Sequence, residues 1–441
     1  MNKEDVDIST DIGGVKCSGP LAVSSHDPDK PWFPATPLDR WVNLFIRYTK
    51  AGAGHLIMPS IVPLSDETEP PEFYKHKGRR HYIGRWIPYV YKDWFEQKEM
   101  KVGYFWVGTT SVWIKTRDGE KLLRAICDHP EYDPEKVPMM GNVLCDNPDP
   151  KIWAEHAKWL EELGCQMLEI NFGCPCGAFE MPGVPKDETR YGAMLGTLPP
   201  AIEAITKEVV KNVKVPCLVK LTPEAGYPGL LLCAEAGKRG GAKGVVTTHM
   251  AIAMPPPDIH GDPPGKTPWP FTKSYPVATI AGPAERFFMY KGVAMVHSTF
   301  PDLEIEAGAG IVHPEHTVEA IFLGAKSVQT LSGVVWNGLN FITRTNDYLR
   351  SYMAQHNFKT IEDFRGFTIK NYFKPLVNDD FIDAHAEVDV GKCRNCGICE
   401  DNWCPAITRG DYYAVYNKEE CSGCGMCVMI CPHDAVTLKA R

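Results

Sequence analysis

Eight cysteines near the C-terminus have the spacing of a site for iron–sulfur clusters. They form two runs, CxxCxxCx4CP with Cys393, Cys396, Cys399 and Cys404, and CxxCxxCx3CP with Cys421, Cys424, Cys427 and Cys431. Tight loops of this spacing direct three thiolates at one cubane, and the fourth cysteine of each run ligates the other cluster. The spacing therefore predicts two [4Fe–4S] clusters that carry single electrons. One would be held by Cys393, Cys396, Cys399 and Cys431, and the other by Cys421, Cys424, Cys427 and Cys404.

Two zinc sites are the alternative use of eight cysteines. Zinc would need four ligands for each ion and no proline after the last cysteine, whereas Pro405 and Pro432 each follow a distal cysteine. The first run has one residue more before Cys404 than the commonest spacing, which leaves its cubane type open. Residues 385–441 are accordingly predicted to form a ferredoxin-like α+β domain, and the rest of the chain must use or supply its electrons.

The composition is that of a globular chain of 441 residues, 44% of them hydrophobic and 23% charged. The net charge is −8 and no run of five basic residues occurs, so neither nucleic acid nor a membrane surface is an expected partner. The N-terminal residues lack the apolar core of a secretory signal, and no apolar stretch is long enough to span a bilayer. We expect a cytoplasmic protein whose 16 cysteines are reduced or metal-bound.

Short apolar runs alternate with amphipathic stretches through most of the chain, which is the pattern of repeated βα units. Eight runs are predicted strands, at residues 19–25, 54–60, 137–144, 165–172, 215–221, 243–249, 303–308 and 326–331. Residues 149–164 and 198–213 are predicted helices, and the first places Trp153, Ala157, Leu160 and Leu163 on one face. Eight units favour an α/β fold of the closed (β/α)8 barrel type within residues 1–370.

Two connections, residues 61–136 and 250–281, are too long for ordinary βα turns. The first contains many aromatic residues: Tyr74, Tyr82, Trp86, Tyr89, Tyr91, Trp94, Tyr104, Trp106 and Trp113. These side chains would wall a pocket for a flat substrate, or they would simply pack the insertion onto the barrel.

The motif NFGCPCG (171–177) follows the fourth predicted strand. Active sites of (β/α)8 barrels lie at the C-terminal ends of the strands, so Asn171 and Cys174 stand where catalytic groups belong. A free cysteine is also often a small buried apolar side chain, which is the structural alternative for Cys174. Lys220 stands alone in an apolar strand and is a second candidate for the site. The structural alternative is that its side chain extends to solvent at the end of the strand.

Several motifs resemble the pyrimidine-reducing half of dihydropyrimidine dehydrogenases and, more distantly, dihydroorotate dehydrogenases. They are LEINFGCPCG (168–177), VPCLVKLTPE (215–224), GGAKGVVTTH (240–249), GKTPWP (265–270), EAGAGI (306–311) and GAKSVQTLSGV (324–334). The resemblance covers most of the chain except residues 61–136. It implies FMN at the mouth of the barrel, Cys174 as general acid or base, Asn171 as a substrate contact and Lys220 beside the flavin pyrimidine ring.

The flavin phosphate needs backbone N–H groups at glycine turns, which barrels commonly provide after strands seven and eight. Gly308, Gly310, Ser332 and Gly333 occupy those positions, although glycines there also serve as plain turn residues. The implied chemistry is hydride transfer from flavin to a polarised C=C, with a thiol that protonates the neighbouring carbon from the opposite face.

The sequence departs from this family at the substrate end. Pro59 replaces a lysine that contacts flavin, while His249 and Met250 replace an asparagine and a threonine. A histidine cannot serve both donor and acceptor of a pyrimidine imide edge as an asparagine can. His249 is therefore predicted to bind a carbonyl or phenolate oxygen or to act as a second proton donor, with a plain core histidine as the alternative. Cys176 stands where the family has histidine.

We expect an FMN- and iron–sulfur-dependent oxidoreductase that reduces, or forms, a ring C=C conjugated to a carbonyl in a small cyclic substrate. The expected substrate is a pyrimidine such as uracil or thymine, or another cyclic or phenolic ring. No complete GxGxxG fingerprint is present, so a ferredoxin or a flavoprotein subunit with an NAD(P)H site would donate electrons. The resemblance also implies homo- or hetero-oligomers. A non-catalytic electron-transfer subunit is the competing class, and a dihydrouridine-type RNA enzyme lacks support because no basic patch is evident.

Overall fold

The computed structural model describes residues 1–26, 38–62, 84–92, 99–108, 114–145, 148–174, 195–268, 278–377, 380–402 and 404–441. The chain divides into two compact units, the first from most of residues 1–372 and the second chiefly from residues 373–441. Among the described helices, none is both long enough and apolar enough to cross a membrane.

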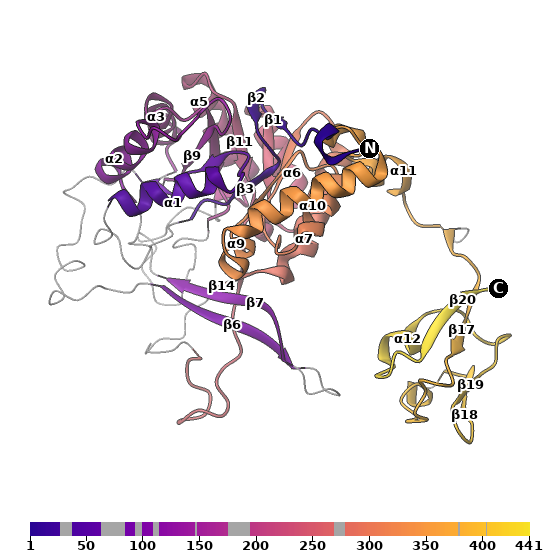
Figure 1. The fold of residues 1–441 in the computed structure, drawn as a ribbon. Coiled ribbons are helices and arrows are strands. Elements are labelled where there is room, and N and C mark those ends of the chain that lie inside the picture. Colours follow the sequence, from indigo (N-terminus) through magenta and orange to yellow (C-terminus); the bar gives the residue numbers. More distant parts are fainter. Residues whose placement is uncertain are drawn as a thin grey trace. The chain divides into compact units, whose positions relative to one another are not determined.

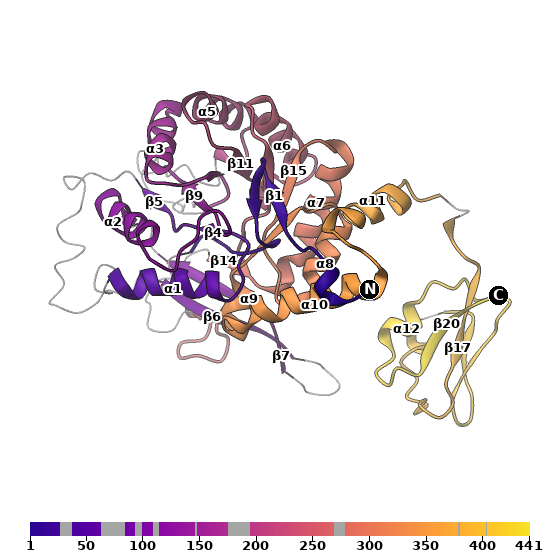
Figure 2. The same cartoon turned by 45° about the horizontal axis from the view of Figure 1, so that its top comes forward.

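The first unit is a closed barrel of eight parallel strands, as Figure 2 shows from its upper side. In order around the barrel these are β3 (Leu21–Val23), β4 (Leu56–Ile57), β9 (Met139–Val143), β10 (Met167–Asn171), β11 (Cys217–Lys220), β12 (Gly244–Thr247), β15 (Glu304–Ala307) and β16 (Ser327–Thr330). β16 pairs with β3 and closes the ring. All eight predicted strands and the (β/α)8 class are confirmed.

Helices cover the outside of the barrel (Figure 1). They are α1 (Leu38–Lys50), α2 (Thr116–Cys127), α3 (Pro150–Glu162), α5 (Pro199–Asn212), α6 (Gly229–Arg239), α7 (Arg286–Thr299), α8 (Pro314–Phe322) and α10 (Asn340–His356). Both predicted helices, α3 and α5, are present. In α3 the Asp149 side chain accepts a hydrogen bond from the Lys151 amide, and Trp153 is fully buried on the predicted face.

The first long connection is shorter than the predicted range, residues 61–136. Its last part forms α2, a regular barrel helix whose Leu122, Leu123 and Ile126 are buried in the core. The sequence analysis missed this helix because the aromatic stretch before it obscured the amphipathic pattern. Two short strands, β5 (Ile61–Val62) and β8 (Ile114–Lys115), pair in parallel where the insertion leaves and rejoins the barrel.

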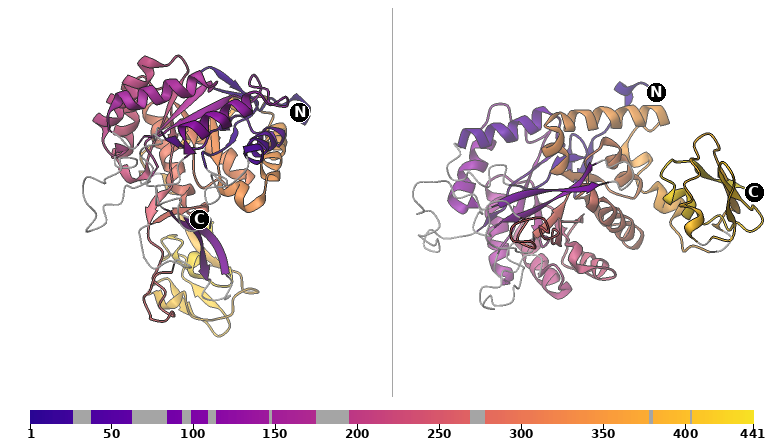
Figure 3. Two further views of the ribbon diagram at one scale, coloured as in Figure 1. Left: turned by 90° about the vertical axis from the view of Figure 1, so that its left-hand side faces the viewer. Right: turned by 90° about the horizontal axis from the view of Figure 1, so that it is seen from below.

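The two long connections build one antiparallel sheet with the order β13-β14-β7-β6. Its strands are β6 (Gly84–Lys92), β7 (Glu99–Gly108), β13 (Ala251–Ala253) and β14 (Ala278–Ala281). β14 of the second connection pairs with β7 of the first, and Figure 3 shows this ribbon beside the barrel. The aromatic side chains predicted to wall a pocket lie outside the residues whose side chains are described.

A hairpin of β1 (Thr10–Ile12) and β2 (Val15–Cys17) closes the N-terminal end of the barrel. Ile12 and Cys17 pack with Ile57, Met140 and Leu218 in one apolar cluster. The hairpin turn holds a glycine at φ +60°, where a Cβ would lie 2.3 Å from a proline side chain that precedes β11. With this end plugged, ligands can enter only at the opposite, C-terminal ends of the strands.

The second unit is a small α+β fold. β17 (Ala384–Val388) pairs with β20 (Val436–Ala440), and β18 (Ile407–Arg409) pairs with β19 (Ala414–Tyr416). The short helix α12 (Met426–Ile430) lies within the second cysteine run and contains Cys427. Its small core combines apolar side chains with the cysteines of both runs. A 4Fe–4S ferredoxin-like unit was predicted here, and the fold agrees.

Candidate active site and cluster-binding unit

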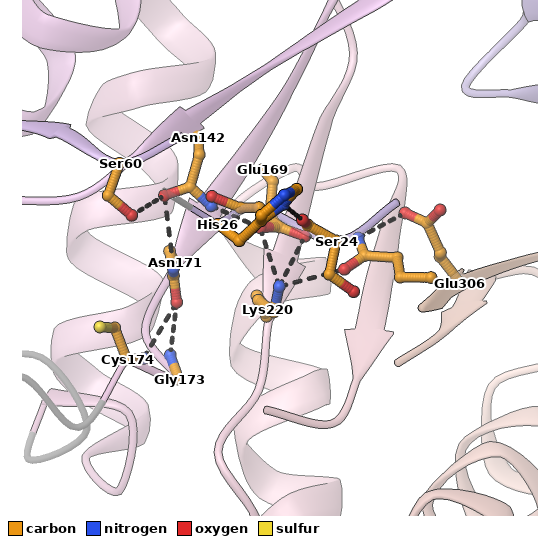
Figure 4. A network of polar contacts seen from close by, with 12 residues as sticks. Ser24, His26, Ser60, Asn142, Glu169, Asn171, Gly173, Cys174, Lys220 and Glu306 are labelled. Carbon is orange, nitrogen blue, oxygen red and sulfur yellow. Dashed lines mark hydrogen bonds and ion pairs between the residues drawn. The ribbon is translucent and has the colours of Figure 1, made fainter. Parts of the chain in front are cut away.

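A network of buried charged and polar side chains fills the centre of the barrel (Figure 4). The Lys220 ammonium on β11 lies 3.1 Å from Oε1 of Glu169 on β10 and 3.1 Å from Oε1 of Gln329 on β16. Gln329 also donates to Glu169 at 2.6 Å and to Glu306 of β15 at 2.9 Å. Lys220 is 4% exposed and Glu169 is fully buried, so Lys220 does not extend to solvent.

His55 completes the charge balance of this network. Its Nε2 lies 2.9 Å from Oε1 of Glu306, and both side chains are fully buried. Burial alone lowers the pKa of His55, but the Glu306 carboxylate and the Cys17 side chain outweigh it and raise the pKa to about 10. Burial alone raises the pKa of Glu306, but His55, Gln329 and Lys220 hold it below its usual value. Two cations thus neutralise two carboxylates.

The network extends to the loop that carries Cys174. Asn142 of β9 donates to Glu169, and its Oδ1 accepts from Asn171 at 3.3 Å. Oδ1 of Asn171 in turn accepts the backbone N–H groups of Gly173 at 3.1 Å and Cys174 at 3.0 Å. Both acceptor positions of the Asn171 amide are therefore occupied within the protein. Asn171, predicted as a substrate contact, shapes the turn that presents Cys174.

Cys174 and His249 are neighbours through Gly173. A Cβ on Gly173 would lie 2.4 Å from the Cβ of His249, so only glycine allows this approach. The backbone N–H of His249 donates to the Leu221 carbonyl at 3.0 Å, which fixes the segment after β12. Two groups predicted to move protons thus lie at the same end of the barrel. Cys176 lies outside the described residues.

A cavity opens at the C-terminal ends of the strands, with about 510 Å³ of unfilled space including its mouth. Its lining includes five of the residues predicted for the catalytic and flavin-binding site: Lys220, His249, Gly308, Gly310 and Ser332. Asn171, Cys174 and Gly333 do not line it. The Gly333 amide donates to Thr330 Oγ1 at 3.0 Å, and a Cβ on Gly333 would lie 2.6 Å from Phe341. Gly333 therefore serves as a turn residue, which the sequence analysis gave as the alternative.

The turn after β15 fits an anionic group. Ala309 and Gly310 both have positive φ, 74° and 77°, and their backbone N–H groups meet no acceptor among the described residues. Successive free N–H groups in such a turn form a concave anion site. With Lys220 at the inner end of the same cavity, these residues fit a flavin mononucleotide, whose ring carries acceptor oxygens and whose tail carries a phosphate.

Sequence reasoning missed several lining residues. Ser24 and Ser25 follow β3 and line the cavity, as does Glu285 after β14. The serines end the first predicted strand, so the strand-end rule that selected Asn171 would have found them. Pro59, which replaces a lysine of the resembling family, is not among the lining residues.

The eight C-terminal cysteines surround two hollows. One, of about 360 Å³ including its opening, is lined by Cys393, Cys396, Cys399 and Cys431. The other, of about 690 Å³, is lined by Cys399, Cys404, Cys421, Cys424 and Cys427. This grouping matches the two predicted ligand sets, with Cys399 facing both. No three metal-binding side chains of the described residues converge on a single ion.

Backbone N–H groups already point at two of these sulfurs. Ala386 donates to Sγ of Cys421 and Ala435 donates to Sγ of Cys431, each at 3.3 Å. Such hydrogen bonds stabilise thiolate ligands and help set cluster potentials. The donor set and its hydrogen bonds therefore fit cubane clusters.

The fold and these sites define an oxidoreductase that combines a flavin-type barrel with a 4Fe–4S unit. The chain matches the 4Fe-4S binding domain over residues 414–437 and the dihydrouridine synthase (Dus) family over residues 132–226, which include β9 to β11 and the Cys174 motif. A ligand-free type DHODH from Eimeria tenella superposes with a TM-score of 0.60 over 85% of this chain and 94% of its own, at 14% identity.

The sequence relatives are dehydrogenases. The chain is 25% identical to the NAD-dependent dihydropyrimidine dehydrogenase subunit PreA of Escherichia coli, over 64% of this chain and 68% of that protein. It is 28% identical to the chloroplastic dihydropyrimidine dehydrogenase (NADP(+)) of Arabidopsis thaliana, over 56% of each. The resemblance that the sequence motifs carry is confirmed.

Removal of the Lys220 charge should destabilise the barrel. In Lys220→Met the Glu169 carboxylate stays buried without its cation, so the free energy of unfolding should fall by about 3–5 kcal/mol. Lys220→Met combined with Glu169→Gln removes both charges and should recover most of this loss. Anaerobic urea unfolding followed by tryptophan fluorescence measures it, and equal losses in the single and double variants would contradict the pairing.

The His55–Glu306 pair predicts a pH dependence of stability. The folded-state pKa of His55 is raised to about 10 from 6.5, so its stabilisation is complete below pH 6.5 and lost as the pH rises towards 10. Relative to His55→Gln, the wild type should lose about 1.4 kcal/mol per pH unit in this window. His260→Gln, at an exposed histidine, is the control. Parallel pH profiles for wild type and His55→Gln would refute the pair.

Proposed function

We propose that the protein is an FMN- and iron–sulfur-dependent oxidoreductase that reduces, or forms, a ring C=C conjugated to a carbonyl. The observation that carries the proposal is the cavity at the C-terminal ends of the strands. Its lining brings together Lys220, the turn at residues 308–310 and Ser332. Bound FMN would supply hydride chemistry there. The relatives that act on dihydropyrimidines are similar over most of the barrel.

Each protein group has a distinct task in this proposal. Lys220 donates to both carboxylate oxygens of Glu169 and to Gln329, and its positive charge would attract the flavin oxygens. Asn171 fixes the turn at Gly173 and Cys174. Cys174 does not line the cavity, so the proposal requires its thiol to reach the carbon beside the one that receives hydride. A thiol with an ordinary pKa of about 8.5 is protonated at neutral pH and can donate the proton there. His249 binds an oxygen of the ring.

We further propose that two [4Fe–4S] clusters in the C-terminal unit supply the electrons, one at a time. The two cysteine-lined hollows support this. The electron donor would be a ferredoxin or a flavoprotein subunit with an NAD(P)H site. The PreA relative is a subunit of an NAD-dependent enzyme, which favours the second. Free cysteines and oxygen-labile clusters suit a reducing compartment, so we place the protein in the cytoplasm.

Composition and turnover test this proposal. Anaerobically purified protein should contain about eight irons and one FMN per chain. With reduced viologen it should reduce at least one ring among uracil, orotate and the dihydroxybenzenes. Eight irons without flavin would instead support a non-catalytic electron-transfer subunit, and turnover of no ring would refute the reaction. Oxidation of NADH by the chain alone would refute the need for a partner.

Loss of the Cys174 thiol should slow turnover without loss of fold. In Cys174→Ala the proton donor is gone, and we expect kcat to fall about 100-fold to 10,000-fold while flavin and iron contents are retained. The control is Cys165→Ala, at a buried cysteine next to α3 that the mechanism does not use. Equal rates for the wild type and Cys174→Ala would remove Cys174 from the mechanism.

A further inference from the structure

Glu285 is a buried acid in the cavity that has no role so far. It ends the short helix η5 (Pro283–Glu285), which follows β14, and its side chain is 3% exposed. Oε1 accepts a hydrogen bond from the Ala251 amide of β13. Oε2 is buried and has no hydrogen-bond partner among the described residues, while the residue lines the cavity with Lys220 and His249. A buried oxygen of this kind requires a partner, and the cavity is the place for it.

Among the residues that the structure describes, no cation forms an ion pair with Glu285. Lys220 is paired with Glu169, and the Arg286 guanidinium bonds His316. Glu224, an acid whose charge acts on Glu285, accepts the Ile252 amide of β13 at 2.7 Å and is exposed.

The protonation state follows from this setting. Burial is the main influence and raises the pKa of Glu285; the Ala251 hydrogen bond lowers it and Glu224 raises it further, to about 8. At neutral pH most Glu285 side chains are therefore uncharged and carry an O–H group. A carboxylic acid that an apolar site keeps neutral is a strong hydrogen-bond donor to a developing oxyanion.

We propose that Glu285 donates a hydrogen bond from Oε2 to an oxygen of the ligand bound in the barrel cavity. The proposal rests on the proposed function for the identity of that ligand. When hydride adds to the carbon β to a ring carbonyl, negative charge develops on the carbonyl oxygen, and a fixed donor at that oxygen lowers the barrier. The same chemistry would serve an oxygen of the flavin itself, so the acceptor belongs either to the ring substrate or to FMN.

Glu285→Gln and Glu224→Gln separate this role from a structural one. Glu285→Gln keeps an acceptor for Ala251 and an N–H donor in place of the O–H, but it does not titrate. Glu224→Gln changes an exposed acid that supports the adjacent amide of the same strand. Each holoenzyme is first assayed for flavin and iron. Uracil binding, from the change in flavin absorbance, and FMN release, from flavin fluorescence, are then followed between pH 6.5 and 9.5.

In the wild type, the dissociation constant of uracil should be constant below about pH 8 and rise about tenfold per pH unit above it. Glu224→Gln should keep this rise but begin it at a lower pH, because the Glu224 charge raises the pKa of Glu285. In Glu285→Gln the dissociation constant should be independent of pH and close to the wild-type value at pH 7. If FMN release shows this difference and uracil does not, the acceptor is on the flavin and the donor role stands. Identical pH profiles for wild type and Glu285→Gln in both measurements would overturn the role of Glu285. Absence of flavin from all three proteins would instead overturn the proposed function.

Discussion

The ion pair of Lys220 and Glu169 is the interaction on which the barrel centre depends. Neither group could stay charged there alone, because an unpaired buried ion costs several kcal/mol. Gln329 joins this pair to Glu306, which His55 neutralises. Residues from β10, β11, β15 and β16, together with His55 directly before β4, therefore share one system of hydrogen bonds and ion pairs. Parallel strands that slide by one residue would turn these side chains outwards, so the system also fixes the strand register.

This network positions the groups that face the cavity. Lys220, which lines the cavity, is held by Glu169 of the adjacent strand β10 and by Gln329 of the more distant strand β16. Through Asn142 and Asn171, the same network reaches the turn at Gly173 and Cys174, and Gly173 lies against His249. A site supported by packed strands is held more rigidly than one carried by loops alone. The polar centre thus links barrel stability to the geometry of proton transfer.

The two long connections form one structure, although nothing in either segment alone indicates it. They pair as the β13-β14-β7-β6 sheet, and the second connection brings Glu285 and the Ala251 amide to the cavity. Substrate recognition would then depend on the second connection together with His249, a residue at which this chain departs from the resembling family. The C-terminal unit is built on different principles, because its core is small and its cysteines take part in it.

The sequence alone determined what local patterns encode. Eight apolar runs gave the barrel strands, α3 and α5 followed from helical periodicity and capping, and cysteine spacing predicted the two ligand groups. Lys220, Gly308, Gly310 and His249 were found because strand-end positions and family motifs mark them.

Tertiary structure decided everything that depends on partners distant in the chain. The sequence could not show that Lys220 pairs with Glu169, 51 residues away. Nor could it show that the side-chain oxygen of Asn171 accepts the backbone N–H of Cys174. It could not pair β7 with β14 or identify Glu285 as a buried acid without a partner, since strand pairing and burial depend on which segments the closed barrel brings together. Local spacing fixes which residue types are available, and only the folded chain fixes their neighbours, their desolvation and hence their protonation.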